Sequence, residues 1–169
     1  DDILIGSLGI DSAVFSDQDN QVDLRITTSQ NTGDGNDILT AIENVNAGDG
    51  NDIVSGNSRA NTLSGEGGDD ILTGNDGTDT LNGGSGDDTL NGGDGNDTSV
   101  FSDAGNQVDL TITTSQNTGD GNDTLISIEN VNAGGGADTV IGNSGNNILN
   151  GEGGEDTLYG NDGDDTLIG

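Results

Sequence analysis

One nine-residue pattern repeats six times without slippage between Ala47 and Val100, and this repetition limits the possible folds more than any other feature. Read from its first glycine, one unit is Gly65-Glu66-Gly67-Gly68-Asp69-Asp70-Ile71-Leu72-Thr73. The general form is G-G-x-G-x-D-x-U-x, where U is apolar and x is any residue. A constant short period is typical of a solenoid, in which each repeat packs only on its neighbours.

Each half of the nonapeptide has a separate structural task. Glycines at the first, second and fourth positions are expected to allow a tight turn through positive φ. The last three residues, such as Ile71-Leu72-Thr73, alternate outward, inward and outward, as in a short β-strand. A turn and a strand every nine residues predict a flattened coil with two strands per eighteen residues. Stacked coils would give an all-β fold of two parallel sheets that face each other across a thin core of U residues.

The sixth position of the repeat indicates metal binding. Residues eighteen apart would lie on neighbouring rungs, about 4.8 Å apart, so Asp52, Asp70 and Asp88 are expected to form one column. The other column would be Asn61, Asp79 and Asp97. At this spacing neighbouring carboxylates repel by about 1 kcal/mol in water and about 3.5 kcal/mol at an effective dielectric constant near 20. Ca²⁺ lies about 2.3–2.6 Å from its oxygen ligands, so an ion midway between two carboxylates matches the rung spacing. Exposed glycine carbonyls could complete the coordination.

These repeats resemble the calcium-binding nonapeptides of RTX (repeats-in-toxin) proteins. Thirteen windows share the frame; eleven carry Asp at the sixth position and two carry Asn. The resemblance implies a right-handed parallel β-roll, or β-solenoid, with several Ca²⁺ ions bound in the glycine-rich turns. The expected side-chain ligands are Asp11, Asp37, Asp52, Asn61, Asp70, Asp79, Asp88, Asp97, Asp123, Asp138, Asn147, Asp156 and Asp165. The expected backbone ligands are the carbonyl oxygens of Gly65, Gly67, Gly74, Asp76, Gly83, Gly92, Gly151 and Gly160.

The composition fits a chain that needs metal to fold. Its 169 residues carry a net charge of -30 and include thirty-two glycines, only two arginines and no lysine, histidine or cysteine. Low hydrophobicity with high charge ordinarily indicates disorder, so calcium is expected to decide whether the chain folds. The lack of basic clusters excludes nucleic-acid binding, and no apolar run is long enough for membrane insertion. The usual catalytic bases and nucleophiles are missing, so the chain is not expected to be an enzyme.

An extracellular or cell-surface location is expected from calcium availability and from the resemblance. Weak extracellular modules bind calcium in the millimolar range that prevails outside cells. RTX proteins are typically exported by a bacterial type I secretion system that reads an uncleaved C-terminal signal, and they fold around calcium after export. No N-terminal signal peptide is visible in this chain.

A longer repeat is superimposed on the nonapeptides. The first 83 residues align with the last 83 at an offset of 86, and 57 of these positions are identical. The chain is therefore expected to be a single solenoid, 1–169, made of two copies, 1–86 and 87–169. Each copy contains an insertion that is expected to form a wider coil of the same solenoid, at 15–46 and 101–132. The sequence does not identify which residues of these wider coils bind calcium.

The sequence also predicts the structural roles of one segment, two glutamates and two asparagines in and near the wider coils. The alternating segment 22–27 predicts a strand. Glu43 and Glu129 are expected on a solvated face rather than in a calcium shell. Asn61 and Asn147 are expected to give weaker or less complete calcium sites, because Asn offers an oxygen without a charge.

Functions of different classes stay open. The duplication favours a structural or spacer module of a large secreted or cell-surface protein, such as an adhesin, an S-layer or a filament. The alternative is the folding and secretion module of an exported enzyme or toxin. Thr62, Thr80 and Thr98 form a regular hydroxyl column that would suit an ice-binding solenoid, but Ile148 interrupts it in the second copy. The chain starts and stops in the same phase of the repeat, which favours a fragment of a longer array over a filament subunit that stacks end to end.

Overall fold

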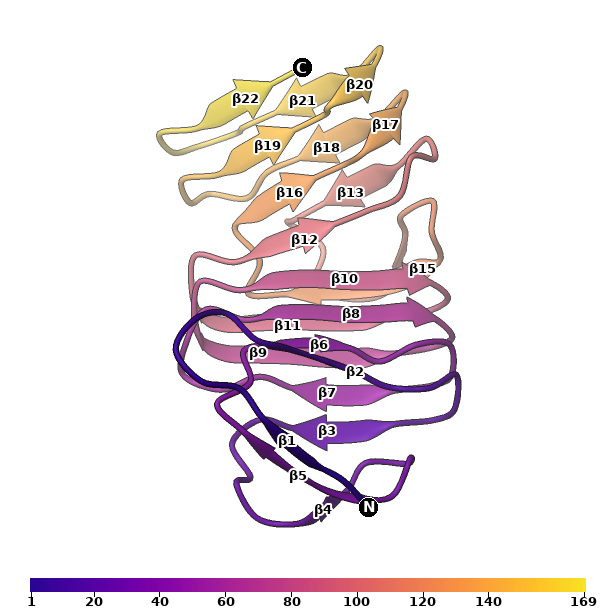
Figure 1. Ribbon diagram of the computed structural model, residues 1–169. Coiled ribbons are helices and arrows are strands. Elements are labelled where there is room, and N and C mark those ends of the chain that lie inside the picture. The colour runs from indigo at the N-terminus through magenta and orange to yellow at the C-terminus, as the bar shows by residue number, and fades with distance from the viewer.

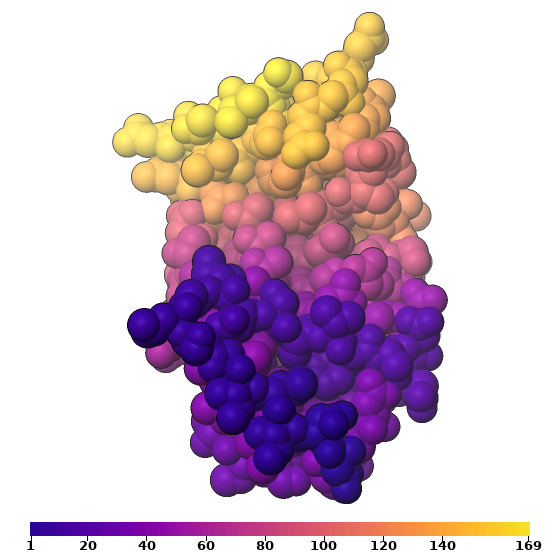
Figure 2. All heavy atoms as spheres, viewed as in Figure 1, coloured from indigo at the N-terminus to yellow at the C-terminus, as the bar shows by residue number.

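Stacked short strands account for the whole architecture. The computed structural model describes residues 1–169 as twenty-two β-strands without a helix. Figure 1 shows the strands stacked along one axis, with the N-terminus at one end and the C-terminus at the other. In the space-filling view of Figure 2 the colours change in bands along this axis, so each part of the sequence stays in one part of the stack. The all-β parallel roll expected from the nonapeptides is confirmed.

One side of the roll is a continuous parallel sheet of eight strands. Within each nonapeptide run its register is eighteen residues, as in the pairing of Leu63 with Leu81. In spatial order the strands are β2 (Ser12–Val14), β6 (Asn44–Asn46), β8 (Thr62–Gly67), β10 (Thr80–Ser85), β12 (Thr98–Val100), β16 (Asn130–Asn132), β19 (Ile148–Asn150) and β22 (Thr166–Ile168).

The other side of the roll is divided into shorter sheets. Its central sheet contains β3 (Gln21–Asp23), β7 (Ile53–Ser55), β9 (Ile71–Gly77), β11 (Thr89–Gly95), β15 (Asn122–Ile126) and the antiparallel β14 (Gln116–Asn117). The N-terminal sheet contains β1 (Ile3–Ile5), β5 (Asn36–Thr40) and the antiparallel β4 (Gln30–Asn31). The C-terminal sheet contains β13 (Gln107–Asp109), β18 (Thr139–Ile141) and β21 (Thr157–Tyr159). Two turns also pair, through β17 (Gly135–Gly136) and β20 (Gly153–Gly154).

The apolar eighth position of the repeat forms the core between the two sides. Leu63, Leu72, Leu81 and Leu149 are fully buried, and they belong to one cluster of twenty-one buried apolar residues. Burying a Leu or Val side chain contributes about 1.5–3 kcal/mol. The thin core therefore stabilises each coil only when a neighbouring coil covers it.

The glycines of the repeat have two different reasons to be there. At the fourth position most glycines have positive φ, as in Gly68 at 128° and Gly86 at 140°, although Gly95 does not. The second position also has positive φ, but there Glu66 at 72° and Asn75 at 78° replace glycine. The first position does not have positive φ in any of these repeats, so that part of the expectation is wrong. Glycine is needed there for space, as the site geometry shows below.

The wider coils give the two sides of the roll different numbers of rungs. On the continuous sheet one 86-residue copy supplies four strands, β2, β6, β8 and β10. On the other side it supplies five, because the wider coil contributes both β5, which pairs with β1, and β3, which pairs with β7. The second copy repeats this with β15 on β11 and β13 on β18. Figure 1 shows the strands after β12 at a slant to β8 and β10, as expected where one side gains a rung.

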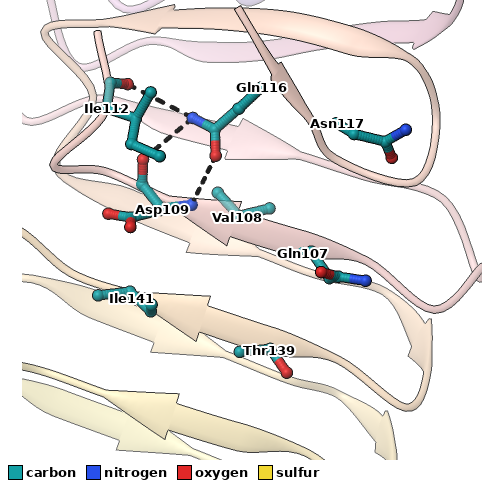
Figure 3. A pocket seen from close by; sticks show the side chains of 8 residues that line it. All are labelled: Gln107, Val108, Asp109, Ile112, Gln116, Asn117, Thr139 and Ile141. Carbon is teal, nitrogen blue, oxygen red and sulfur yellow. Dashed lines mark hydrogen bonds between the residues drawn. The ribbon is translucent and has the colours of Figure 1, made fainter.

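A glutamine side chain bridges the gap between the two strands of each wider coil. In the second copy Gln116 Oε1 accepts a hydrogen bond from Asp109 N at 2.8 Å. Gln116 Nε2 donates to Asp109 O at 3.0 Å and to Ile112 O at 3.4 Å, in a shallow pocket of about 230 Å³ (Figure 3). The first copy repeats this arrangement around Gln30. The side-chain amide thus takes the place of a peptide group from a neighbouring strand.

The strand expected over 22–27 ends early. β3 stops at Asp23, where Arg25 N donates to Asp23 Oδ1 at 2.9 Å and Ile26 N donates to Asp23 O at 3.1 Å. An aspartate that bonds the backbone two residues on forms a turn, and here this turn overrides the alternating pattern. The Arg25 guanidinium also bonds this carboxylate and holds its pKa below the ordinary value.

Candidate calcium-binding site

The sixth-position residues form columns along both sides of the roll. Most of them lie one residue before a strand, and Asp37 and Asp123 lie inside β5 and β15, so the strand register stacks them. Beside the continuous sheet the column is Asp11, Glu43, Asn61, Asp79, Asp97, Glu129, Asn147 and Asp165. On the other side the column has three parts: Asp2 and Asp37; Asn20, Asp52, Asp70, Asp88 and Asp123; and Asn106, Asp138 and Asp156.

In most rungs one carboxylate oxygen of the column residue extends the backbone ladder. Asp52 N donates to Asp70 Oδ1 at 2.8 Å, and Asp70 N donates to Asp88 Oδ1 at 2.8 Å. In the opposite column Asn61 N donates to Asp79 Oδ1 at 2.7 Å. These hydrogen bonds hold most column carboxylates against the rung before them, whereas Asp11, Asn61 and Asn147 accept from a backbone N–H of their own turn. The stacking predicted from the eighteen-residue spacing is therefore present in the structure.

The second carboxylate oxygen has no partner in six of these turns. The buried Oδ2 atoms without a hydrogen bond belong to Asp52, Asp70, Asp79, Asp97, Asp138 and Asp156. A buried polar atom without a partner costs about 1–3 kcal/mol, and more when it is charged. Six such atoms in one small chain indicate that a cation belongs beside them.

Carbonyl oxygens converge on the same places. A Cβ built on Gly65 would collide with Asp70 Oδ2 and would lie 2.6 Å from Gly83 O. A Cβ built on Gly74 would likewise meet Asp79 Oδ2 and Gly92 O. This crowding is the reason for glycine at the first position. Carboxylate and carbonyl oxygens are both acceptors, and an arrangement of oxygens alone is the ligand set that Ca²⁺ prefers.

Burial raises the pKa of the central carboxylates. The pKa of Asp70 rises to about 6, mainly through burial, while the hydrogen bond from Asp52 N works in the opposite direction. Burial similarly raises the pKa of Asp79 to about 6 and that of Asp88 to about 7. Neighbouring carboxylates add to the rise, as Asp123 does for Asp88. Burial thus disfavours the charged form of these carboxylates, and a bound cation or a bound proton would offset that cost.

Other predicted ligand positions have a donor of their own. The Thr32 hydroxyl bonds Asp37 Oδ2, and the Thr118 hydroxyl bonds Asp123 Oδ2. Three further positions accept a backbone N–H: Asp11 from Ser7 at 2.9 Å, Asn61 from Asn57 at 2.7 Å and Asn147 from Asn143 at 2.9 Å. Asp88 and Asp165 accept at Oδ1 only, from Asp70 N and Asn147 N. The thirteen predicted positions are thus chemically unequal.

The predicted backbone ligands lie in differing surroundings. Gly74, Gly83, Gly92 and Gly160 each place a carbonyl oxygen beside a column residue. Gly67 O instead accepts a hydrogen bond from Gly50 N at 2.7 Å. The roles of Gly65, Asp76 and Gly151 stay predictions.

Two glutamates belong to the columns, although the sequence pattern had them on a solvated face. That expectation is wrong for Glu43, which is 6% exposed, accepts from Asp11 N at 3.1 Å and pairs with Arg59 at 2.8 Å. Glu129 is half-buried and accepts from Asp97 N at 2.9 Å. The signal was available, because Glu43-Asn44-Val45-Asn46 has the D-x-U-x half of the repeat without its glycine half.

No three acidic side chains gather into a preformed metal cluster. The roll instead supplies one column residue per turn, and the remaining oxygens come from the backbone. Each turn therefore offers part of the oxygen ligand set of a calcium ion, and the neighbouring rung would supply the rest. The unpartnered Oδ2 atoms and the adjacent carbonyls fit calcium in their chemistry.

Comparison with known families gives a consistent result. A family model for the RTX calcium-binding nonapeptide repeat, built of four copies, matches residues 46–81, 73–106 and 132–168. The matched residues make up more than half of the chain and omit most of both wider coils. A search of curated proteins found no match. The structure contains no helix that could span a membrane. RTX nonapeptide repeats bind Ca²⁺ in their turns, and this chain, with stacked aspartates in those turns, belongs to the RTX calcium-binding repeat family.

Proposed function

We propose that this chain is a structural or spacer module of a large secreted or cell-surface protein, and that it folds on Ca²⁺ binding outside the cell. The observation that carries the proposal is the set of six buried Oδ2 atoms without a partner. The two similar copies support a spacer, because each adds the same four rungs on one side and five on the other.

The column residues make folding depend on the ion. Asp52, Asp70, Asp79, Asp97, Asp138 and Asp156 would hold calcium, together with turn carbonyls such as Gly83 O and Gly92 O. Bound calcium supplies positive charge to oxygens that otherwise lack any donor. The Oδ1 atoms meanwhile hold neighbouring rungs in register. Without the ion, adjacent carboxylates repel and the small core does not offset the entropy of an ordered chain.

Circular dichroism of the whole chain tests this function. A calcium titration should convert a coil spectrum to a β spectrum, excess chelator should reverse the change, and magnesium should not replace calcium because it demands a smaller, stricter geometry. The double substitution Asp70→Ala and Asp79→Ala removes one carboxylate from each column. We expect it to raise the calcium concentration at the midpoint at least about tenfold, since each lost charged ligand costs about 1.5–3 kcal/mol.

A matched control removes the same charge from the surface. Asp94→Ala with Asp162→Ala deletes two exposed carboxylates that make no side-chain hydrogen bond, and its midpoint should stay near that of the unaltered chain. Equal midpoints for the two double variants would contradict the assignment of the columns. A β spectrum that persists in chelator would contradict calcium-dependent folding itself.

A further inference from the structure

Two asparagines stand where the sequence repeat would place aspartate. Asn20 lies one rung before Asp52, and Asn106 lies one rung before Asp138. Their exposed fractions are 2% and 0%. Each backbone N–H joins the ladder, from Asn20 N to Asp52 Oδ1 at 2.6 Å and from Asn106 N to Asp138 Oδ1 at 2.7 Å. Both residues are therefore full members of the column.

The side-chain nitrogen of each asparagine gathers three carbonyl oxygens. Asn20 Nδ2 donates to Ser16 O at 2.8 Å, Gln18 O at 2.6 Å and Ala47 O at 2.9 Å. The second copy repeats this arrangement around Asn106, whose Nδ2 donates to Ser102 O at 2.8 Å, Ala104 O at 2.9 Å and Ala133 O at 2.8 Å. The side chains at 18 and 104 differ, so only the backbone makes this cage.

The same cage has no donor in the aspartate turns. The carbonyl of Ala47 lies five residues before Asp52, the next column residue after Asn20. By strand register, the equivalent carbonyl for Asp70 is that of Gly83, which lies five residues before Asp88. Asp70 presents Oδ2 there, which has no partner. A carboxylate oxygen facing carbonyl oxygens needs a cation, whereas an amide nitrogen bonds them directly.

A glycine from the wider coil covers each asparagine. A Cβ built on Gly33 would lie 2.5 Å from Asp19 O and 3.0 Å from Asn20 Oδ1. A Cβ built on Gly119 would lie 2.7 Å from Asn106 Oδ1. The asparagine turn is thus closed over and excluded from water in both copies. Asn20 Oδ1 and Asn106 Oδ1 also lack a hydrogen-bond partner, but each belongs to a neutral amide and so carries no charge for a cation to neutralise.

We propose that Asn20 and Asn106 replace a calcium ion in their turns, so that each copy contains one turn that closes without metal. The inference rests on the proposed function and specifies which turns of this chain bind calcium. Calcium binding on this side of the roll then starts one rung later, at Asp52 and at Asp138.

Calcium stoichiometry of the full chain tests the inference. Asn106→Asp exchanges the donor for an acceptor and a charge within an intact carbonyl cage. Equilibrium dialysis should give one additional calcium ion per chain for Asn106→Asp, and two for Asn20→Asp combined with Asn106→Asp. The control Asn117→Asp adds the same charge at an exposed position in the same wider coil and should add no ion.

A second measurement covers the case in which Asn106→Asp does not fold. In the calcium-saturated unaltered chain, the Nδ2 protons of Asn20 and Asn106 should exchange with water at least about tenfold more slowly than those of Asn117. Equal exchange rates would overturn the inference, as would a folded Asn106→Asp chain with no additional ion. If the unaltered chain bound no calcium at all, the proposed function would fail instead.

Discussion

The first-position glycine shows how a single residue links the backbone to the metal chemistry. Gly151 does not have positive φ, so backbone conformation does not require glycine there. A Cβ built on it would meet Asp156 Oδ2, the atom that lacks a partner. Gly153, two residues later in the same turn, has open space around its built Cβ. Gly151 is thus required because a larger side chain has no room, whereas nothing in the space around Gly153 requires glycine.

Substitution of these two glycines should separate the two cases. Gly151→Ala should lower the free energy of unfolding in saturating calcium by about 1–3 kcal/mol, because the added methyl displaces the Asp156 carboxylate. Gly153→Ala should change it by less than about 0.5 kcal/mol, as at an ordinary surface position. Urea denaturation at fixed calcium concentration measures both. Equal losses would mean that the first glycine is not required for space.

The sequence predicts the column positions but not the state of their oxygens. The eighteen-residue spacing places Asp52, Asp70 and Asp88 correctly, because this spacing sets the strand register directly. Whether a second oxygen has a donor depends on a residue four or five places earlier, such as Ser7 for Asp11 or Thr32 for Asp37. The repeat pattern contains no information about these local contacts.

At the scale of elements, the wider coils are the part that the sequence predicted least well. They were expected as wider coils of one solenoid, but which side of the roll gains a strand was not predicted, and each adds a strand to one side only. Strand spacings of 32 and 35 residues replace the spacing of eighteen there. No periodicity predicts which side receives the extra strand. The glutamine that fills the resulting gap can be recognised only once β13 and β15 are placed.

Removal of Gln116 should weaken the connection between β13 and β15 without unfolding the roll. Gln116→Ala removes the acceptor of the Asp109 N–H, so hydrogen exchange of that amide should become about fivefold faster, which corresponds to one hydrogen bond of ~1 kcal/mol. Gln107→Ala alters an exposed glutamine of β13 that makes no side-chain hydrogen bond and serves as the control. Unchanged exchange at Asp109 in the first variant would show that another group closes the gap.

For the whole molecule, net charge is the dominant constraint. Thirty-two acidic residues and only two arginines give the net charge of -30, and both arginines lie in the first copy, where each pairs with a carboxylate. The second copy has Thr111 and Gly145 at these positions. Its acidic side chains therefore have no basic partner within the chain.

Protons should substitute in part for calcium in the metal-free chain. Burial raises the folded-state pKa of Asp70 and Asp79 to about 6 and that of Asp88 to about 7, above the ordinary value of 3.8. Protonation thus favours the folded state, and its contribution is complete below the ordinary value and is lost as pH rises through 6–7. Circular dichroism of the metal-free chain should show β signal increasing from pH 7.5 to pH 4. A constant coil spectrum over this range would contradict the expectation.

Because the rungs stack along one axis, the end-to-end length of the chain changes greatly between the folded and the unfolded state. The eight rungs of the continuous sheet, about 4.8 Å apart, span roughly 34 Å along the axis, whereas 169 residues pulled straight reach about 560–610 Å. Between two anchored neighbours, calcium would therefore set the reach of this segment over a more than tenfold range. A pull along the axis would release one coil of about eighteen residues at a time, each adding about 60 Å of slack.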